Sequence, residues 1–242
     1  MESNIPLLAV AAIFIVMTIG AALQGSVGYG MALISSPILI QMDPDFIPGP
    51  FILPSLILIT AMIVRDKQAI DLSGLRWAIL GMVPGTILGA LILASFETDI
   101  LVTIFALLVL VAVGLSVAGL HITRSRWVLG SAGLLSGLMG ILATLSGPPI
   151  ALVYQDAQGP RLRATLSGFF LVSIFFAIVS LVVVGKYGWH EIQLSLYLIP
   201  GVILGFLLSS RIVPFVDRGN TRPIILTIAA LSAIIIMGKQ FL

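Results

Sequence analysis

The sequence predicts an all-α integral membrane protein made of two inverted repeats, each half a broken-helix hairpin followed by three transmembrane helices. Three observations predict this fold. First, the 242 residues are 59% hydrophobic and only 9% charged, whereas soluble domains carry roughly 25% charged residues. Second, the basic residues divide very unevenly between the loops of two faces. Third, glycine- and proline-rich motifs recur in the same order in the two halves.

Eight apolar segments divide the chain, and six of them have the length of a single crossing, which needs about 20 residues. Segment 5–42 is too long for one crossing, and its break around Gln24–Gly30 fits either two crossings or a deep hairpin. Segment 127–154 is too short for two crossings and contains glycines and a double proline, both of which disfavour a continuous helix. We therefore expect two short helices that meet near mid-membrane. The single crossings are 46–64, 75–95, 99–119, 164–185, 191–210 and 222–241.

Loop charges favour the hairpin interpretation of segment 127–154. If both long segments enter and leave on one face, lysine and arginine divide ten to two between the faces; if 127–154 crosses once, they divide six to six. The positive-inside rule selects the uneven division. It places the ten in the cytoplasm and both termini outside, in a multi-pass protein of the cell's cytoplasmic membrane. The ten are Arg65, Lys67, Arg76, Arg124, Arg126, Arg161, Arg163, Arg211, Arg218 and Arg222.

The two halves carry matching motifs. Gln24–Pro37 lies over Ser136–Pro149 at a constant offset of 112, and Pro84-Gly85 lies over Pro200-Gly201 at an offset of 116. We assign residues 1–119 and 127–242 as two repeats of one transmembrane domain. Because each repeat holds an odd number of crossings, the second must be inverted relative to the first. Inverted repeats with paired broken helices are typical of secondary transporters, whose substrate site lies at the repeat interface.

Both broken segments supply groups that suit a small oxyanion. Glycines let backbone N–H groups approach a ligand, and a helix that starts after a break points its positive end into the site. The alternative is close helix packing, which we favour for Gly133, Gly137 and the series Gly81, Gly85, Gly89. The candidate substrate-binding residues are Gly25, Ser26, Gly28, Tyr29, Gly30, Ser35, Ser36, Pro37, Thr144, Ser146, Gly147, Pro148, Pro149, Arg163 and Thr165.

Two groups of candidates have a structural role as the alternative to a functional one. Pro84, Gly85, Pro200 and Gly201 would form hinges, because each proline frees a backbone carbonyl, or they would mark static kinks. Arg163 would attract an anion at the inner mouth, or it would be an interfacial anchor that obeys the charge rule. Thr165 is a helix cap or a ligand.

The residues that are absent narrow the function. No Asp, Glu, Lys, Arg or His falls in the middle of an apolar segment, and the chain has no cysteine, so we expect no proton relay within the membrane and no thiolate site. We find no phosphate-binding loop, metal-ligand spacing or nucleophile–base pair, and we expect no enzymatic activity, cofactor, metal or nucleic-acid partner. The expected partners are a small anion and the lipid bilayer; a homo-oligomer is compatible with the sequence.

The chain resembles the sulfite exporter TauE/SafE family of membrane permeases (TSUP) over essentially its whole length. The likeness rests on Gly25-x-x-Gly28-Tyr29-Gly30 and Pro37, on Gly137-x-x-Gly140 leading to Gly147-Pro148-Pro149 and Tyr154, on Arg163-Ala164-Thr165 and Phe169-Phe170, and on the paired Pro-Gly motifs. The resemblance implies transport of small sulfur-containing anions, such as sulfite, thiosulfate or organosulfonates. Where the family often has a run of glycines before Pro-Pro, this sequence has Thr144-Leu145-Ser146-Gly147, which leaves the substrate open.

Direction and mechanism have alternatives too. The negative cell interior drives anions outward by roughly 2.3 kcal/mol per charge per 100 mV, so the lack of a coupling residue favours export. The inverted repeat predicts alternating access at a midplane site. Coupled uptake stays an alternative, as do an anion channel and a non-transporting scaffold or accessory subunit. A scaffold would leave no polar cavity between the two broken segments.

Overall fold

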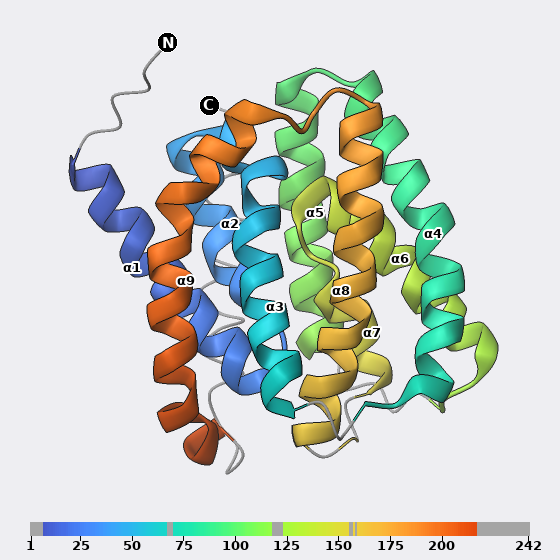
Figure 1. Ribbon diagram of the computed structural model, residues 1–242. Helices are drawn as coiled ribbons and strands as arrows, with labels where there is room; N and C mark the ends of the chain where they lie inside the picture. Colours follow the sequence, from blue (N-terminus) through green and yellow to red (C-terminus); the bar gives the residue numbers. More distant parts are fainter. Residues whose placement is uncertain (1–6, 67–69, 118–122, 155–156, 158, 217–242) are drawn as a thin grey trace.

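The computed structural model describes residues 7–66, 70–117, 123–154, 157 and 159–216, and every regular element in these ranges is a helix (Figure 1). The predicted crossing at 222–241 lies outside the described residues. The elements are α1 (Leu7–Val27), α2 (Met31–Met42), the short 3-10 helices η1 (Pro44–Phe46) and η2 (Gly49–Phe51), α3 (Ile52–Asp66), α4 (Leu72–Ser95), α5 (Thr98–Val117), α6 (Arg126–Ala143), α7 (Gly147–Val153), α8 (Gly159–Val183) and α9 (Trp189–Val216).

Six of the described helices are long and apolar enough to cross a membrane: α1, η2 together with α3, α4, α6, α8 and α9. Their outward faces carry large apolar side chains such as Ile15, Leu91 and Phe175, each more than half exposed. Such surfaces are stable against lipid and would aggregate in water. The predicted class, an all-α integral membrane protein, is confirmed.

The first hairpin has unequal arms. α1 has 21 residues and α2 has 12, which at 1.5 Å per residue spans about 18 Å, short of the roughly 30 Å hydrocarbon core. The chain turns between them at Gly28 and Gly30, whose φ angles of 105° and 123° are disfavoured for residues with a Cβ. Of the two alternatives for segment 5–42, the structure has the hairpin.

The second hairpin is also uneven. α6 has 18 residues and α7 has 7, so the expectation of two short helices is wrong for the first arm. α6 ends where Thr144 adopts the left-handed conformation (φ 58°) and the Leu145 N–H donates to the Met139 carbonyl at 3.1 Å, a C-terminal closure of the Schellman type. Pro148 and Pro149 occupy the first turn of α7, where a missing N–H costs nothing.

The glycines of α6 do not break the helix because they are packing residues. A Cβ on Gly133 would overlap the Ala78 carbonyl of α4, and one on Gly85 would overlap the Leu134 carbonyl of α6. The two backbones therefore lie in direct contact, as small residues permit between membrane helices. The packing role predicted for the Gly81, Gly85, Gly89 series and for Gly133 and Gly137 is confirmed.

A second crossing of the same kind joins α1 and α9. A Cβ on Gly201 would lie 2.7 Å from the Phe14 carbonyl, and one on Gly205 would overlap the Thr18 carbonyl. Under the predicted repeat α6 corresponds to α1 and α9 to α4, so the α4–α6 and α1–α9 crossings are equivalent. This reciprocity supports the inverted repeat, which stays a prediction because the last segment lies outside the described residues.

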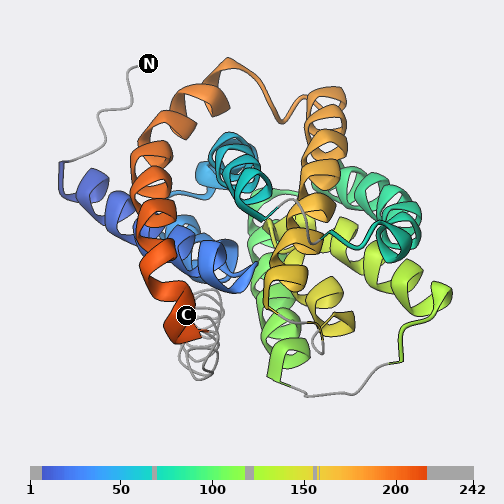
Figure 2. The same ribbon diagram turned by 60° about the horizontal axis from the view of Figure 1, so that its bottom comes forward.

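The basic loops gather at one end, the lower end in Figure 1. Asp71, between α3 and α4, pairs with Arg161 in the first turn of α8 at 3.1 Å and with Arg124 before α6 at 4.0 Å. The Arg65 guanidinium reaches the Ser209 hydroxyl of α9 at 3.1 Å. Figure 2 turns this end of the molecule toward the viewer. The opposite end carries the α4–α5 and α8–α9 connections and the η1–η2 segment.

Candidate functional site

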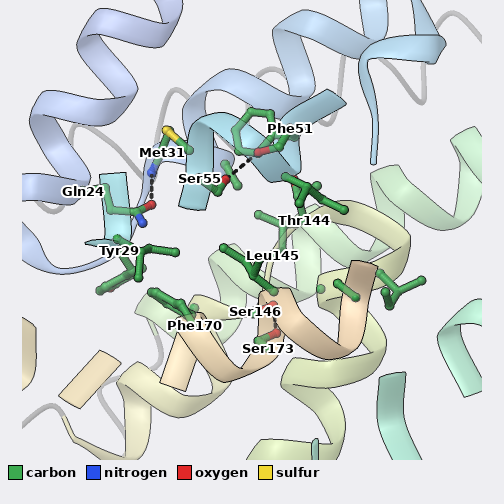
Figure 3. A pocket seen from close by; sticks show the side chains of 18 of the residues that line it. Gln24, Tyr29, Met31, Phe51, Ser55, Thr144, Leu145, Ser146, Phe170 and Ser173 are labelled. Carbon is green, nitrogen blue, oxygen red and sulfur yellow. Dashed lines mark hydrogen bonds between the residues drawn. The ribbon is translucent and has the colours of Figure 1, made fainter. Parts of the chain in front are cut away.

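A cavity of about 90 Å³ lies between the two broken segments. It is bounded by the break after α1, the start of α2, α3, the end of α6, the start of α7, and α8 (Figure 3). One water needs roughly 10–15 Å³ on this measure, so the cavity has room for a compact anion. The predicted site residues that line it are Tyr29, Gly30, Thr144, Ser146, Gly147 and Pro148.

The wall from the first repeat is the N-terminus of α2. Its first residues, Met31, Ala32 and Leu33, line the cavity, and its N-cap residue, Gly30, has no side chain to bond their N–H groups. The Gln24 side-chain oxygen accepts the Met31 N–H at 3.2 Å, which leaves the amide NH₂ of Gln24 as the part that donates hydrogen bonds. The positive end of a helix and an amide donor therefore face the cavity together.

The wall from the second repeat is the turn from α6 to α7. Gly147 lies so near the first break that a Cβ would come within 2.9 Å of the Tyr29 Cβ and 3.4 Å of the Phe170 ring. The Ser36 and Thr144 hydroxyls are 2.7 Å apart and join the two hairpins directly. The Ser146 hydroxyl lies 3.5 Å from that of Ser173 on α8. The two predicted segments do meet, and they meet at the cavity.

The sequence analysis missed several polar and aromatic residues of the lining. Ser55, Thr86 and Ser173 come from α3, α4 and α8, and no local motif marks them as facing a shared space. Figure 3 shows Phe51 and Ser55 on one side of the cavity, opposite Phe170 and Ser173. Gln24 could have been found, since it heads the repeated motif. The lining residues absent from the predicted site are Gln24, Met31, Ala32, Leu33, Phe51, Ile52, Ser55, Ile59, Thr86, Gly137, Gly140, Ile141, Leu145, Phe170, Ser173, Ile174 and Ala177.

The remaining predicted residues support the site from outside the cavity lining. Ser26 and Ser35 donate to the carbonyls of Ala22, at 2.6 Å, and Val16, at 3.3 Å. The Thr165 hydroxyl accepts the Asp71 N–H at 3.0 Å, so it anchors the α3–α4 connection instead of capping its own helix. The residues in this group are Gly25, Ser26, Gly28, Ser35, Ser36, Pro37, Pro149, Arg163 and Thr165.

Arg163 is buried with 4% of its surface exposed, although the positive-inside rule would leave it at the interface. Its guanidinium donates to the Ser26 carbonyl at 3.0 Å and lies 3.7 Å from the Asp66 carboxylate. Arg65 donates to the neighbouring Gly25 carbonyl at 2.6 Å. Arg65 and Arg163 therefore donate hydrogen bonds to carbonyls at the end of α1 that have no partner within the helix.

Replacing Arg163 with methionine is expected to lower the free energy of unfolding by about 2–4 kcal/mol, because the buried Ser26 carbonyl loses its donor and the Asp66 carboxylate loses one of its two guanidinium partners. Arg161→Met is the matched control, since the Arg161 side chain is 54% exposed and such pairs contribute about 1 kcal/mol or less. Thermal unfolding in detergent measures both. Equal losses in the two variants would contradict the capping role.

Asp71 joins several elements at the basic end. It begins α4 as the N-cap. Hydrogen bonds from the Ser73 hydroxyl and the Gly74 N–H, with the attraction of Arg161, hold the pKa of Asp71 below its ordinary value of 3.8 in spite of partial burial. The carboxylate therefore stays charged at neutral pH and fixes the α3–α4 connection to the start of α8.

The predicted hinge positions lie inside continuous helices. α4 continues through Pro84 and α9 through Pro200. Gly85 and Gly201 are at the two close crossings described above, which gives both a packing role. A hinge at these positions stays a prediction.

No residue in the described lining of the cavity is Asp, Glu, Lys, Arg or His. Among the described residues, no group of three or more His, Asp or Glu side chains is placed to hold a metal ion. The polar part of the lining consists of hydroxyls, one primary amide and backbone N–H groups, all of them neutral. The arrangement can bind a small anion through hydrogen bonds and a helix dipole.

Comparison with known proteins identifies one family. The model of the family described as sulfite exporter TauE/SafE matches residues 12–236, which is nearly the whole chain. Neither the curated proteins nor the solved structures contain a significant match to this chain.

Proposed function

The chain belongs to the sulfite exporter TauE/SafE family, and on that premise we propose that it exports small sulfur-containing anions, such as sulfite, thiosulfate or organosulfonates, across the cytoplasmic membrane. The cavity between the two broken hairpins is the substrate site of this proposal. Its substrate-binding groups are the N-terminus of α2, the Gln24 amide and the hydroxyls of the lining. Access to the cavity alternates between the two faces.

The observation that carries the proposal is the meeting of two broken segments, about 112 residues apart in sequence, around one polar cavity. In lipid, interrupted backbone is stable only where protein or a polar cavity satisfies the freed groups. Transporters of this architecture use such breaks to present helix ends to an ion. A scaffold or accessory subunit would fill this space with packed side chains, so the cavity favours transport.

Charge supports the outward direction. Arginines gather at the end that the positive-inside rule assigns to the cytoplasm, among them Arg65, Arg124 and Arg161. The opposite end carries Asp43, Asp45, Glu97 and Glu191, together with Lys186. Surface charge of one sign raises the local concentration of the opposite ion, so anions would collect at the inner mouth and be repelled from the outer one. The membrane potential adds to this bias.

Opening toward the cytoplasm would separate the end of α1 from α3 and α8. The contacts that would break are those of Arg65 and Arg163 with the Gly25 and Ser26 carbonyls. The halves would move about the close crossings α4–α6 and α1–α9, with Pro84 and Pro200 as the positions where the two helices bend. An anion channel is the alternative mechanism within this function.

Reconstitution in liposomes tests the proposed function. Purified protein is expected to carry sulfite, thiosulfate or sulfoacetate, faster when the membrane potential drives anions toward the predicted outer face. No flux of any of these anions under either polarity of the potential would refute transport. Turnover too slow for single-channel currents is expected for a transporter, and resolvable unitary currents would show a channel.

A further inference from the structure

We propose that the cavity selects its substrate by charge state: it accepts singly charged oxyanions, excludes doubly charged ones, and uses the Thr86 hydroxyl as a specificity-determining donor. This inference rests on the proposed function and deepens it. Sulfite is then carried as hydrogen sulfite, and sulfonates that carry a single charge overall are accepted. Thiosulfate and sulfoacetate, which carry two charges near neutral pH, are excluded from the candidate substrates named above.

The first argument is the neutrality of the cavity. None of its described lining residues carries a formal charge. Arg65 and Arg163, which lie at the break after α1, contact Asp66 and the carbonyls at the end of α1. An ion that leaves water for a poorly polar site loses solvation free energy, and this loss grows with the square of the charge. Neutral donors and one helix end can offset the loss for one charge much better than for two.

The second argument is the state of Thr86. Its side chain is buried with 1% of its surface exposed, it lines the cavity, and its hydroxyl has no hydrogen-bond partner among the described residues. Serines and threonines inside helices ordinarily donate to the carbonyl four residues earlier. Thr18 does so to Phe14 at 2.7 Å, and Ser55 does so to Phe51 at 2.7 Å. A buried hydroxyl without a partner is costly, and a bound anion would satisfy it.

The third argument is that most other hydroxyls of the lining are already engaged. Thr144 contacts the Ala143 carbonyl and the Ser36 hydroxyl, Ser55 is bonded to Phe51, and Ser146 faces Ser173. The donors left for a ligand include the Gln24 amide, the Ala32 and Leu33 N–H groups of α2 and the Thr86 hydroxyl, since the Met31 N–H is already bonded to Gln24. A small set of neutral donors matches a single negative charge.

Competition and pH test the selection of charge state in the unmodified protein. In proteoliposomes that carry sulfite, methanesulfonate has one charge at every pH used, and its inhibition constant is expected to be the same at all of them. Sulfate, with two charges, is expected to compete at least about tenfold more weakly. Sulfite flux at fixed total sulfite is expected to fall about tenfold per pH unit above its second ionisation, as hydrogen sulfite is depleted.

The Thr86 assignment is tested with Thr86→Val, which keeps the shape of the side chain and removes the hydroxyl. The apparent affinity for methanesulfonate is expected to fall about tenfold to a hundredfold, as for the loss of a hydrogen bond to a charged group. Thr18→Val is the matched control, since Thr18 lies in α1 outside the cavity lining. The affinity of this variant for methanesulfonate is expected to stay unchanged. An effect no larger in Thr86→Val than in Thr18→Val would overturn the assignment.

The results that would overturn the selection of charge state differ from the result that would refute transport. Sulfate that competes as well as methanesulfonate, or sulfite flux that does not fall with rising pH, would overturn the selection of charge state and leave transport intact. Absence of flux for every anion would instead refute the proposed function.

Discussion

Replacing Gly147 with leucine is expected to reduce anion flux at least about a hundredfold, because the new side chain would occupy the cavity itself. Gly147 is buried and its Cβ position already lies 2.9 Å from the Tyr29 Cβ and 3.4 Å from the Phe170 ring. The remaining atoms of leucine would extend from there into a space of only about 90 Å³. Flux of sulfite or methanesulfonate in proteoliposomes measures the loss.

Gly114→Leu is the control for this substitution. Gly114 is exposed on α5, and nothing lies within 4 Å of the position where a Cβ would be. We expect this variant to transport normally. Elution as a single species and an unchanged helical circular dichroism spectrum would show that Gly147→Leu is folded. A folded Gly147→Leu protein with normal flux would place the substrate pathway outside this cavity.

A large loss of stability is also expected from adding a methyl group at the close crossings. Gly85→Ala would bring a Cβ into the Leu134 carbonyl of α6, and Gly205→Ala would bring one into the Thr18 carbonyl of α1. The obstructing atoms are backbone, so the helices must separate. We expect each substitution to lower the free energy of unfolding by about 1–3 kcal/mol or more, as for overpacked cores. Thermal unfolding in detergent measures the change.

Gly114→Ala is the control for these two substitutions, because nothing lies within 4 Å of a Cβ at Gly114. Alanine forms helix better than glycine by roughly 1 kcal/mol, so this variant should be as stable as the parent or more so. If Gly85→Ala and Gly205→Ala behaved like Gly114→Ala, the direct backbone contacts of the two crossings would be refuted. If only one of them destabilised the protein, the proposed equivalence of the crossings would lose its support.

The sequence was sufficient for the fold class and for the location of both breaks. Composition and loop charge depend on the lipid environment and not on tertiary detail, and Gly28, Gly30 and the Pro148-Pro149 pair alter the backbone locally. The length of α6 could not be predicted in this way. Gly133 acts as a breaker in isolation, but in the folded protein it is the contact that lets α6 pack on α4.

Site residues could be predicted only where the local backbone is unusual. Tyr29, Thr144 and Gly147 lie in the breaks themselves and do line the cavity. Thr86 and Ser173 lie within regular helices, and only the three-dimensional arrangement brings them to the same space. Arg163 is a residue for which the rule based on loop charge is wrong. The rule predicts an interfacial anchor, whereas in the structure the guanidinium is buried and donates to the Ser26 carbonyl at the end of α1.

The central claim is that a singly charged oxyanion binds between the two hairpins. Selenite offers a direct measurement, because hydrogen selenite resembles hydrogen sulfite and selenium scatters anomalously. In crystals soaked near neutral pH, the account predicts an anomalous peak in the cavity, within hydrogen-bonding reach of Thr86 and the start of α2. A peak at the Arg65–Arg163 cluster, with no peak in the cavity, would contradict it.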